Sequence, residues 1–129
     1  VIVCLDNANG MMFNHRRQSR DANVVKDILN TIKGTSLLIA PYSEPLFSQA
    51  ECSVSISDSF LTDADANDYC FVENTSVAKF KEKIIYKWNR DYPSDFYFDI
   101  DYANDYKLET TLDFVGTSHE KITKEVYVR

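Results

Sequence analysis

The first half of the chain alternates short apolar runs with one amphipathic segment. "VIVCL" (1–5) and "SLLIA" (36–40) contain no polar alternation, which is typical of strands buried on both faces of a parallel sheet. Between them, Ser19 or Asp21 is expected to cap a helix that runs through Lys33, because apolar residues recur there at spacings of three and four. A strand, a helix and a strand within about forty residues predict a right-handed βαβ unit.

Two more strands are predicted before the middle of the chain, and a short helix precedes them. "YSEPLFSQA" (42–50) suits that helix, with Ser43 as its cap and Pro45 in its first turn. "CSVSIS" (52–57) alternates apolar and polar residues, and "YCFVE" (69–73) is a short run rich in aromatic residues. Each of these two runs is therefore expected to form a strand.

The second half of the chain is rich in aromatic and β-branched residues. "KIIYKW" (83–88) and "FYFDI" (96–100) are therefore expected to be strands. "YKLETTLDFVG" (106–116) and "EKITKEVYVR" (120–129) alternate well and predict an antiparallel hairpin. Together these patterns indicate a single α/β domain over residues 1–129, in which helices flank a mixed, mostly parallel sheet that ends in a C-terminal antiparallel hairpin.

Composition and charge limit which kinds of partner and which cellular location are expected. The 129 residues are enough for one core, and a formal net charge of −6 argues against non-specific nucleic-acid binding by the whole surface. The longest apolar stretches have about six residues, so no membrane span is expected. A cytoplasmic location is the default expectation.

The cysteines and acidic residues do not form a recognisable metal site. Cys4, Cys52 and Cys70 each lie in a strand-like apolar run without a Cys-x-x-Cys partner, so they are expected to be small buried hydrophobic residues. "DADAND" (63–68) has the carboxylate spacing of a calcium loop, but Asn74 stands where the closing glutamate would be required. No metal is therefore expected.

One polar segment, "DNANGMMFNHRRQSRD" (6–21), carries the candidate ligand-binding residues. Its four basic side chains, at positions 15 to 20, directly precede a helix N-terminus, where backbone N–H groups also attract anions. The segment is expected to bind a small anionic molecule or a nucleotide over residues 9–21. The expected contacts are Asn9, Arg16, Arg17, Arg20 and Asp21. The alternative is that the arginines are solvated or pair with some of the twenty acidic residues.

The two histidines of the chain, His15 and His119, support an enzymatic alternative. Two imidazoles on opposite sides of a phosphodiester could act as general base and general acid, with Arg16 or Arg20 stabilising the developing charge. This would make a metal-independent phosphodiesterase or ribonuclease-like enzyme. The simpler interpretation places both histidines on the solvated surface. A third hypothesis is a protein–protein interaction module, with a homodimer formed through the exposed edge of the last hairpin.

Three stretches resemble the dihydrofolate reductase family. "VIVCLDNANGMMFN" (1–14) is similar to its first strand and mobile loop, and "KEKIIYKWNRDYPSDFYFDI" (81–100) to its late strand, polar turn and aromatic segment. "YKLETTLDFVGTSHEKITKEVYVR" (106–129) is similar to its C-terminal hairpin. The resemblance implies a dihydrofolate reductase-like fold. It also implies that Asp21 stands near the carboxylate that faces the substrate's pterin ring, buried and with a raised pKa, while the simpler role of Asp21 is a helix N-cap.

The chain departs from this family where a nicotinamide cofactor would bind. The family uses a Gly-Gly pair to let the backbone approach the cofactor pyrophosphate, whereas no two glycines are adjacent in this sequence. "APYS" (40–43) stands where the family carries Gly-Arg with a nearby Thr and Ser for phosphate contact, and the family's tryptophan after the first loop is missing. We therefore expect a binding domain with no required NADPH cofactor, and not an active folate reductase.

Overall fold

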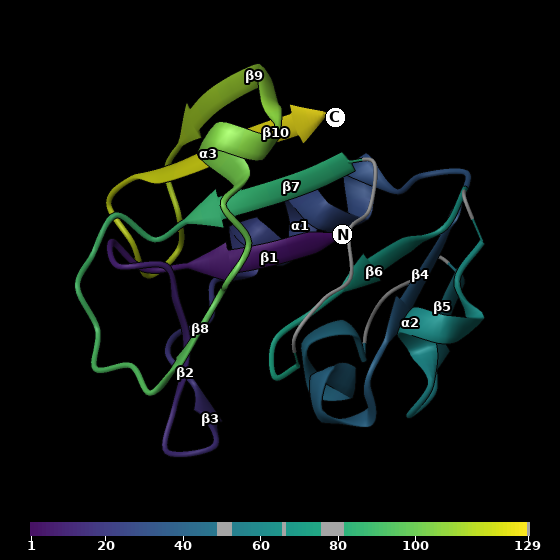
Figure 1. The fold of residues 1–129 in the computed structure, drawn as a ribbon. Helices are drawn as coiled ribbons and strands as arrows, with labels where there is room; N and C mark the ends of the chain where they lie inside the picture. Colours follow the sequence, from purple (N-terminus) through teal and green to yellow (C-terminus); the bar gives the residue numbers. More distant parts are fainter. Residues whose placement is uncertain (49–52, 66, 76–81, 129) are drawn as a thin grey trace.

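A seven-stranded sheet forms the centre of the molecule (Figure 1). The computed structural model describes residues 1–48, 53–65, 67–75 and 82–128. The strands of this sheet are β1 (Ile2–Leu5), β4 (Ser36–Ile39), β5 (Ser53–Ile56), β6 (Tyr69–Phe71), β7 (Glu82–Lys87), β9 (Lys107–Phe114) and β10 (Ile122–Val128). Their order is β5-β4-β6-β1-β7-β10-β9, with parallel pairing from β5 to β7 and antiparallel pairing of β10 with β7 and β9. The predicted fold class is confirmed.

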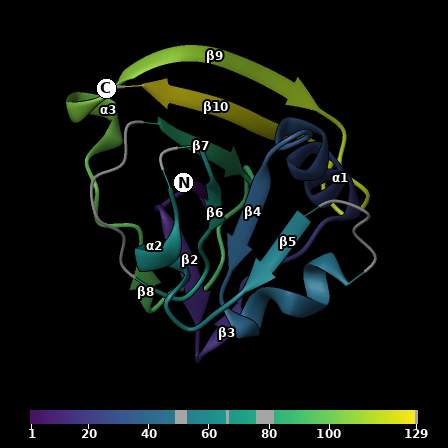
Figure 2. The same cartoon turned by 90° about the vertical axis from the view of Figure 1, so that its right-hand side faces the viewer.

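Each face of the sheet carries its own apolar core, because successive side chains of a strand point to opposite faces. In β1, Ile2 packs on the side of α1 (Ala22–Thr31), whereas Val3 and Leu5 pack on the other side with Tyr102 of α3 (Tyr102–Asp105). Figure 2 shows α1 on one side of the sheet and α2 (Phe60–Asp63) with α3 on the other. The continuous apolar run of β1 is thus explained by burial on both faces.

The helix α1 begins where the sequence predicts. Asp21 is its N-cap, with extended backbone and a side chain that accepts a hydrogen bond from the second backbone N–H of the helix. The helix ends at Thr31, two residues before the predicted Lys33. Gly34 follows with a φ of 85°, a left-handed conformation that glycine adopts without strain.

The polar segment after β1 forms a hairpin rather than a simple connection. Strand β2 (Gly10–Phe13) pairs with β3 (Arg16–Arg17) and with β8 (Phe96–Tyr97) in a second sheet of order β3-β2-β8. Asn14 and His15 form the two-residue turn, with φ of 52° and 60°, as a type I′ turn requires at both positions. The strand expected over 96–100 is therefore shorter than predicted and belongs to this second sheet.

The short helix after β4 also differs in detail from the expectation. It is a 3-10 helix, η1 (Pro41–Phe47), whose N-cap position is Ala40, and Pro41 stands in its first turn. Ser43 is not the cap but lies inside the helix, where its side chain is buried. Its hydroxyl is consequently turned toward the interior.

The expectation that the cysteines are buried is met only in part. Cys70 is buried and Cys4 is half-buried, whereas Cys52 lies outside the described residues. Within the described ranges, none of the helices is long and apolar enough to span a membrane.

Candidate functional site

A narrow pocket, partly open to solvent, lies between α1, the segment that follows β3 and the carboxyl ends of β1 and β6. Its apolar lining residues include Met11, Val24, Val25, Ile28, Leu46 and Phe71. The polar lining residues, here called the polar wall, are Arg17, Gln18, Ser19, Arg20, Asp21 and Glu73. An apolar surface facing a few polar groups is the usual composition of a small-molecule site.

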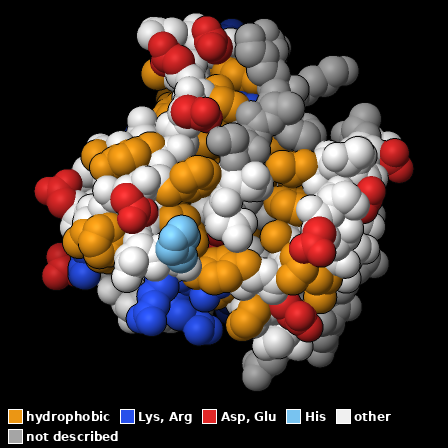
Figure 3. Space-filling model, turned by 60° about the horizontal axis from the view of Figure 1, so that its bottom comes forward, with side chains coloured by type: hydrophobic (Ala, Val, Ile, Leu, Met, Phe, Trp, Pro, Cys, Tyr) orange, Lys and Arg blue, Asp and Glu red, His pale blue; other side chains and the backbone are white. Residues whose placement is uncertain are grey.

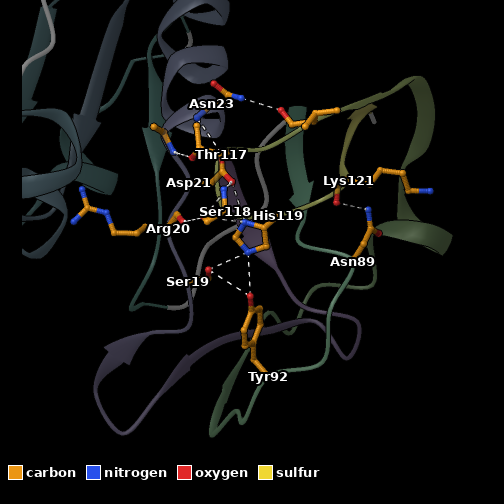
Figure 4. A network of polar contacts seen from close by, with 12 residues as sticks. Ser19, Arg20, Asp21, Asn23, Asn89, Tyr92, Thr117, Ser118, His119 and Lys121 are labelled. Atoms are coloured by element: carbon orange, nitrogen blue, oxygen red, sulfur yellow. Dashed lines mark hydrogen bonds and ion pairs between the residues drawn. The ribbon is translucent and has the colours of Figure 1, made fainter.

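Asp21 lies at the base of the polar wall and accepts hydrogen bonds from two parts of the chain (Figure 4). Its Oδ1 accepts from the backbone N–H groups of Asn23 and Thr117, at 2.9 and 3.0 Å. Its Oδ2 accepts from the backbone N–H of Ser118 and from Nδ1 of His119, both at 2.9 Å. The side chain therefore caps α1 and fastens the turn between β9 and β10 to the helix.

The carboxyl group of Asp21 is more acidic than usual. Burial by itself would raise its pKa, but the hydrogen bonds from His119, Ser118, Thr117 and Asn23 outweigh that effect and hold the pKa well below its ordinary range. The expectation of a raised pKa is therefore wrong. Its physical reason is that the β9–β10 turn brings donors to the carboxylate, so the ionised form is stabilised.

His119 is buried, with 4% of its surface exposed. Its Nδ1 faces the Asp21 carboxylate, which favours the tautomer with the hydrogen on Nδ1. Its Nε2 lies 3.0 Å from Oγ of Ser19 and 3.0 Å from the hydroxyl of Tyr92. The ring stacks on Trp88 with 4.6 Å between ring centroids. The interpretation of both histidines as solvated surface residues is wrong for His119, because aromatic side chains cover its ring.

The turn between β9 and β10 approaches the helix closely because Gly116 has no side chain. A Cβ atom at this position would overlap Oδ2 of Asp21 and lie 3.0 Å from the carbonyl oxygen of His119. The hydroxyl of Ser118 adds a further link, since it donates to the carbonyl oxygen of Arg20 at 2.8 Å. The helix start and the hairpin end thus form one hydrogen-bonded unit.

His15 and Arg16, two of the predicted site residues, lie outside this unit. His15 is exposed at the tip of the β2–β3 hairpin and Arg16 is exposed in β3. Figures 1 and 2 show this tip directed away from the turn that carries His119, and no hydrogen bond among the described residues joins the two histidines. Figure 3, which views the molecule from the hairpin side, shows Lys and Arg side chains gathered beside a histidine. Arg20 is also exposed, but it lines the pocket.

Arg17 is already paired within the protein. Its Nε and Nη2 donate to the two carboxylate oxygens of Glu73, the second residue after β6, at 2.8 and 3.1 Å. The buried hydroxyl of Ser43 donates to the same carboxylate at 2.7 Å. The charges of Arg17 and Glu73 therefore neutralise each other inside the polar wall.

Asn9 and Gln18 differ in their relation to the pocket. Asn9 has a φ of 62°, accepts a hydrogen bond from the hydroxyl of Tyr102 at 2.9 Å, and does not line the pocket. Gln18 does line it, and its amide nitrogen donates to the carboxylate of Asp6 at 3.1 Å. The Oε1 atom of Gln18 is buried and has no hydrogen-bond partner. An acceptor in this state is costly to leave unpaired, so a ligand that donates to it would gain affinity.

Comparison with known proteins identifies the architecture. No model of a protein family matches the sequence, and no curated protein matches it. Among solved structures, the chain is similar to a dihydrofolate reductase from Enterococcus faecalis complexed with NADP(H) and RAB-propyl, with a TM-score of 0.63 over 99% of this chain and 94% of that chain. The chain has a dihydrofolate reductase-like fold. At 11% sequence identity, the likeness concerns the fold alone.

The residues on this dihydrofolate reductase-like fold do not fit the nicotinamide dinucleotide phosphate that the family resemblance implies. The segment expected to contact phosphate, residues 40–43, ends in Ser43, whose hydroxyl is buried and bonded to Glu73. The carboxylate of Glu73 would repel a phosphate group placed beside it, and the guanidinium of Arg17 is committed to that carboxylate. In this segment the Ser43 hydroxyl is therefore already used, and the neighbouring carboxylate disfavours a dinucleotide phosphate.

The sequence reveals only part of the site on this dihydrofolate reductase-like fold. It points to Arg17, Arg20, Asp21 and His119, and it suggests Ser19 merely as an alternative helix cap. Nothing local selects Tyr92 or Trp88, because their role comes from packing on His119. The one available signal is that Ser19 stands two residues before a predicted cap carboxylate, at the end of a basic segment.

Proposed function

We propose that the pocket binds a small organic molecule that carries an anionic group, without nicotinamide-dependent reduction of folate. The observation that carries this proposal is the charge balance of the polar wall. Arg17 is paired with Glu73, and Asp21 with His119 and backbone donors. Among the described residues, no carboxylate lies within ion-pair distance of Arg20, so its positive charge stays available at the pocket.

Two further features define the ligand. Its body should be apolar and flat or small, because α1, η1 and β6 supply aliphatic and aromatic side chains to the pocket lining. It should also carry an N–H or O–H group, because Oε1 of Gln18 has no partner. A hydroxylated aromatic carboxylate satisfies all three requirements, and a nucleoside monophosphate satisfies them with a larger body.

The test is thermal unfolding with four probes: benzoate, p-hydroxybenzoate, adenosine 5′-monophosphate and NADPH. A ligand at about 100 times its dissociation constant adds roughly 2.7 kcal/mol to stability, which corresponds to about 10 °C in this size range. Arg20→Ala should abolish the stabilisation, and the matched variant Arg16→Ala should keep it, since Arg16 is an exposed arginine in β3 that does not line the pocket.

Two results would contradict this proposal. Equal stabilisation of wild type and Arg20→Ala would show that Arg20 does not hold the anion. Stabilisation by NADPH and by none of the other three probes would instead support a nicotinamide-dependent activity. A stronger effect of p-hydroxybenzoate than of benzoate would support the role assigned to Gln18.

The open edge of β9 supports a second proposal, the formation of a homodimer. Among the described residues, this strand ends the seven-stranded sheet and pairs only with β10, and its side chains Leu108 and Leu112 are 44% and 53% exposed. Sedimentation at increasing protein concentration tests the idea. A wild-type dimer that Leu112→Lys converts to a monomer would support it, and a monomer at every concentration would refute it.

A further inference from the structure

Ser19, His119 and Asp21 form a continuous chain of hydrogen bonds along the polar wall (Figure 4). Ser19 Oγ lies 3.0 Å from Nε2 of His119, and Nδ1 of the same ring lies 2.9 Å from Oδ2 of Asp21. The three residues come from the segment before α1, the turn between β9 and β10, and the helix cap. Their order, hydroxyl to imidazole to carboxylate, is the order in which a serine is activated for nucleophilic attack.

The imidazole is held in the orientation that such activation requires. The ionised carboxylate favours the hydrogen on Nδ1, so the lone pair of Nε2 is directed toward the hydroxyl groups of Ser19 and Tyr92. Stacking on Trp88, with an interplanar angle of 18°, fixes the plane of the ring. Nε2 can therefore accept the proton of Ser19 without a prior rearrangement.

The nucleophile is the member of this chain that is open to the pocket. Asp21 and His119 are 3% and 4% exposed, whereas Ser19 is half-buried and lines the pocket. Arg20 lines the same pocket and can hold an anionic group of a substrate. Tyr92 is a second hydroxyl near the reacting atoms, 3.5 Å from Oγ of Ser19.

We propose that Ser19 is the nucleophile of an esterase-type reaction, with His119 as general base and Asp21 as a positioning residue. The substrate class is a small carboxylic ester whose acyl part carries an anionic group. The proposal rests on the proposed function, since the ester must enter the same pocket and meet Arg20.

The steps balance without any further reactant except water. Oγ of Ser19 bonds to the ester carbonyl carbon while its proton moves to Nε2 of His119, and the carbon–oxygen bond to the alcohol then breaks. The alcohol leaves with that proton. Water attacks the acyl group and gives a proton to Nε2, the bond to Oγ breaks, and Ser19 recovers its proton as the carboxylic acid leaves.

A network of this kind could instead serve only to fasten the hairpin to the helix, so the test must read reactivity separately from stability. A small fluorophosphonate reagent is incubated with wild type, Ser19→Ala and Ser48→Ala, and the modified residue is located by mass spectrometry. Ser48 is an exposed serine outside the pocket and serves as the control. We expect one modification, on Ser19, in wild type and Ser48→Ala and none in Ser19→Ala.

Turnover of p-nitrophenyl acetate and mono-p-nitrophenyl succinate completes the experiment. We expect faster hydrolysis of the anionic ester, a loss of about 10²-fold or more in Ser19→Ala, and loss of the preference for the succinate in Arg20→Ala. Asp21→Asn should reduce kcat and change the pH profile of the reaction, which a purely structural role would not do in a variant that remains folded. Among the described residues, Asp21 and Tyr92 are the titratable groups in contact with the His119 ring.

The outcomes separate this inference from the proposed function. An unreactive Ser19 in a protein that still binds p-hydroxybenzoate through Arg20 would overturn the esterase proposal and leave the binding proposal intact. Reaction at Ser19 together with no effect of Arg20→Ala on either ester would support the nucleophile and overturn the preference for anions. Modification that persists in Ser19→Ala would overturn the nucleophile itself.

Discussion

Replacement of Asp21 by asparagine is the change with the most direct consequences for stability. Each carboxylate oxygen accepts from two nitrogen donors at 2.9 to 3.0 Å. The amide group of asparagine keeps one oxygen and has an NH2 group in place of the other. In either orientation, the N–H groups of this NH2 face two N–H donors of the protein. Two charge-assisted hydrogen bonds are lost, each of which contributes about 1.5–3 kcal/mol. We expect Asp21→Asn to lower the free energy of unfolding by about 3–5 kcal/mol.

The pH dependence gives this prediction a second, independent measurement. The pKa of Asp21 in the folded state lies well below its ordinary value, whereas in the unfolded chain it is about 3.9. The stabilisation is therefore complete above the unfolded pKa and is lost as the pH falls through the folded pKa. The difference between wild type and Asp21→Asn should be largest at pH 7 and should shrink progressively below about pH 4.

Urea unfolding followed by tryptophan fluorescence is a suitable assay, because the single tryptophan, Trp88, stacks on His119 next to the replaced carboxylate. Asp99→Asn is a matched control, since Asp99 is exposed and has no hydrogen bond among the described residues. A loss below about 1 kcal/mol in Asp21→Asn at pH 7, or a difference that does not shrink in acid, would refute the account of Asp21 as a buried, hydrogen-bonded carboxylate.

Three further changes test other parts of the structure by urea unfolding. Arg17→Met should lower the free energy of unfolding by about 1–3 kcal/mol, because Glu73 loses its cation, and adding Glu73→Gln should recover most of the loss. Lys83→Met should raise it by about 1 kcal/mol, because the buried Nζ of Lys83 has no hydrogen-bond partner among the described residues and lies over the ring of Tyr106, and a lower stability would contradict this. Gly116→Ala should lower it by about 1–3 kcal/mol, because a Cβ would displace the Asp21 carboxylate, and a neutral effect would show that the turn can move aside.

The elements that follow from local patterns could be predicted from the sequence. Apolar periodicity predicts the helix capped by Asp21, and continuous or alternating apolar runs predict the strands of the seven-stranded sheet. Neither prediction requires tertiary information. The β2–β3 hairpin was not predictable in the same way. Its turn uses Asn14 and His15 in left-handed conformations, and histidine is not a usual residue for a type I′ turn.

Less of the site could be predicted from the sequence, because its interactions join residues that are far apart along the chain. The direction of the Asp21 pKa could not be predicted, since the donors at Thr117 and Ser118 are almost a hundred positions away. The burial of His119 depends in the same way on Trp88 and Tyr92. A sequence pattern identifies the carboxylate, but the sign of its perturbation is decided by what the fold places around it.

The arrangement around Asp21 also decides which pocket residues are free to contact a ligand. A carboxylate offers about four lone-pair sites, and the structure supplies four nitrogen donors to them. Asp21 therefore has no acceptor capacity left for a ligand, unlike a free carboxylate that faces a substrate ring. In our proposal, recognition therefore comes from Arg20, Gln18 and Ser19, which line the pocket and have charge, an acceptor and a hydroxyl to offer. The carboxylate at the start of α1 instead orients the histidine that faces Ser19.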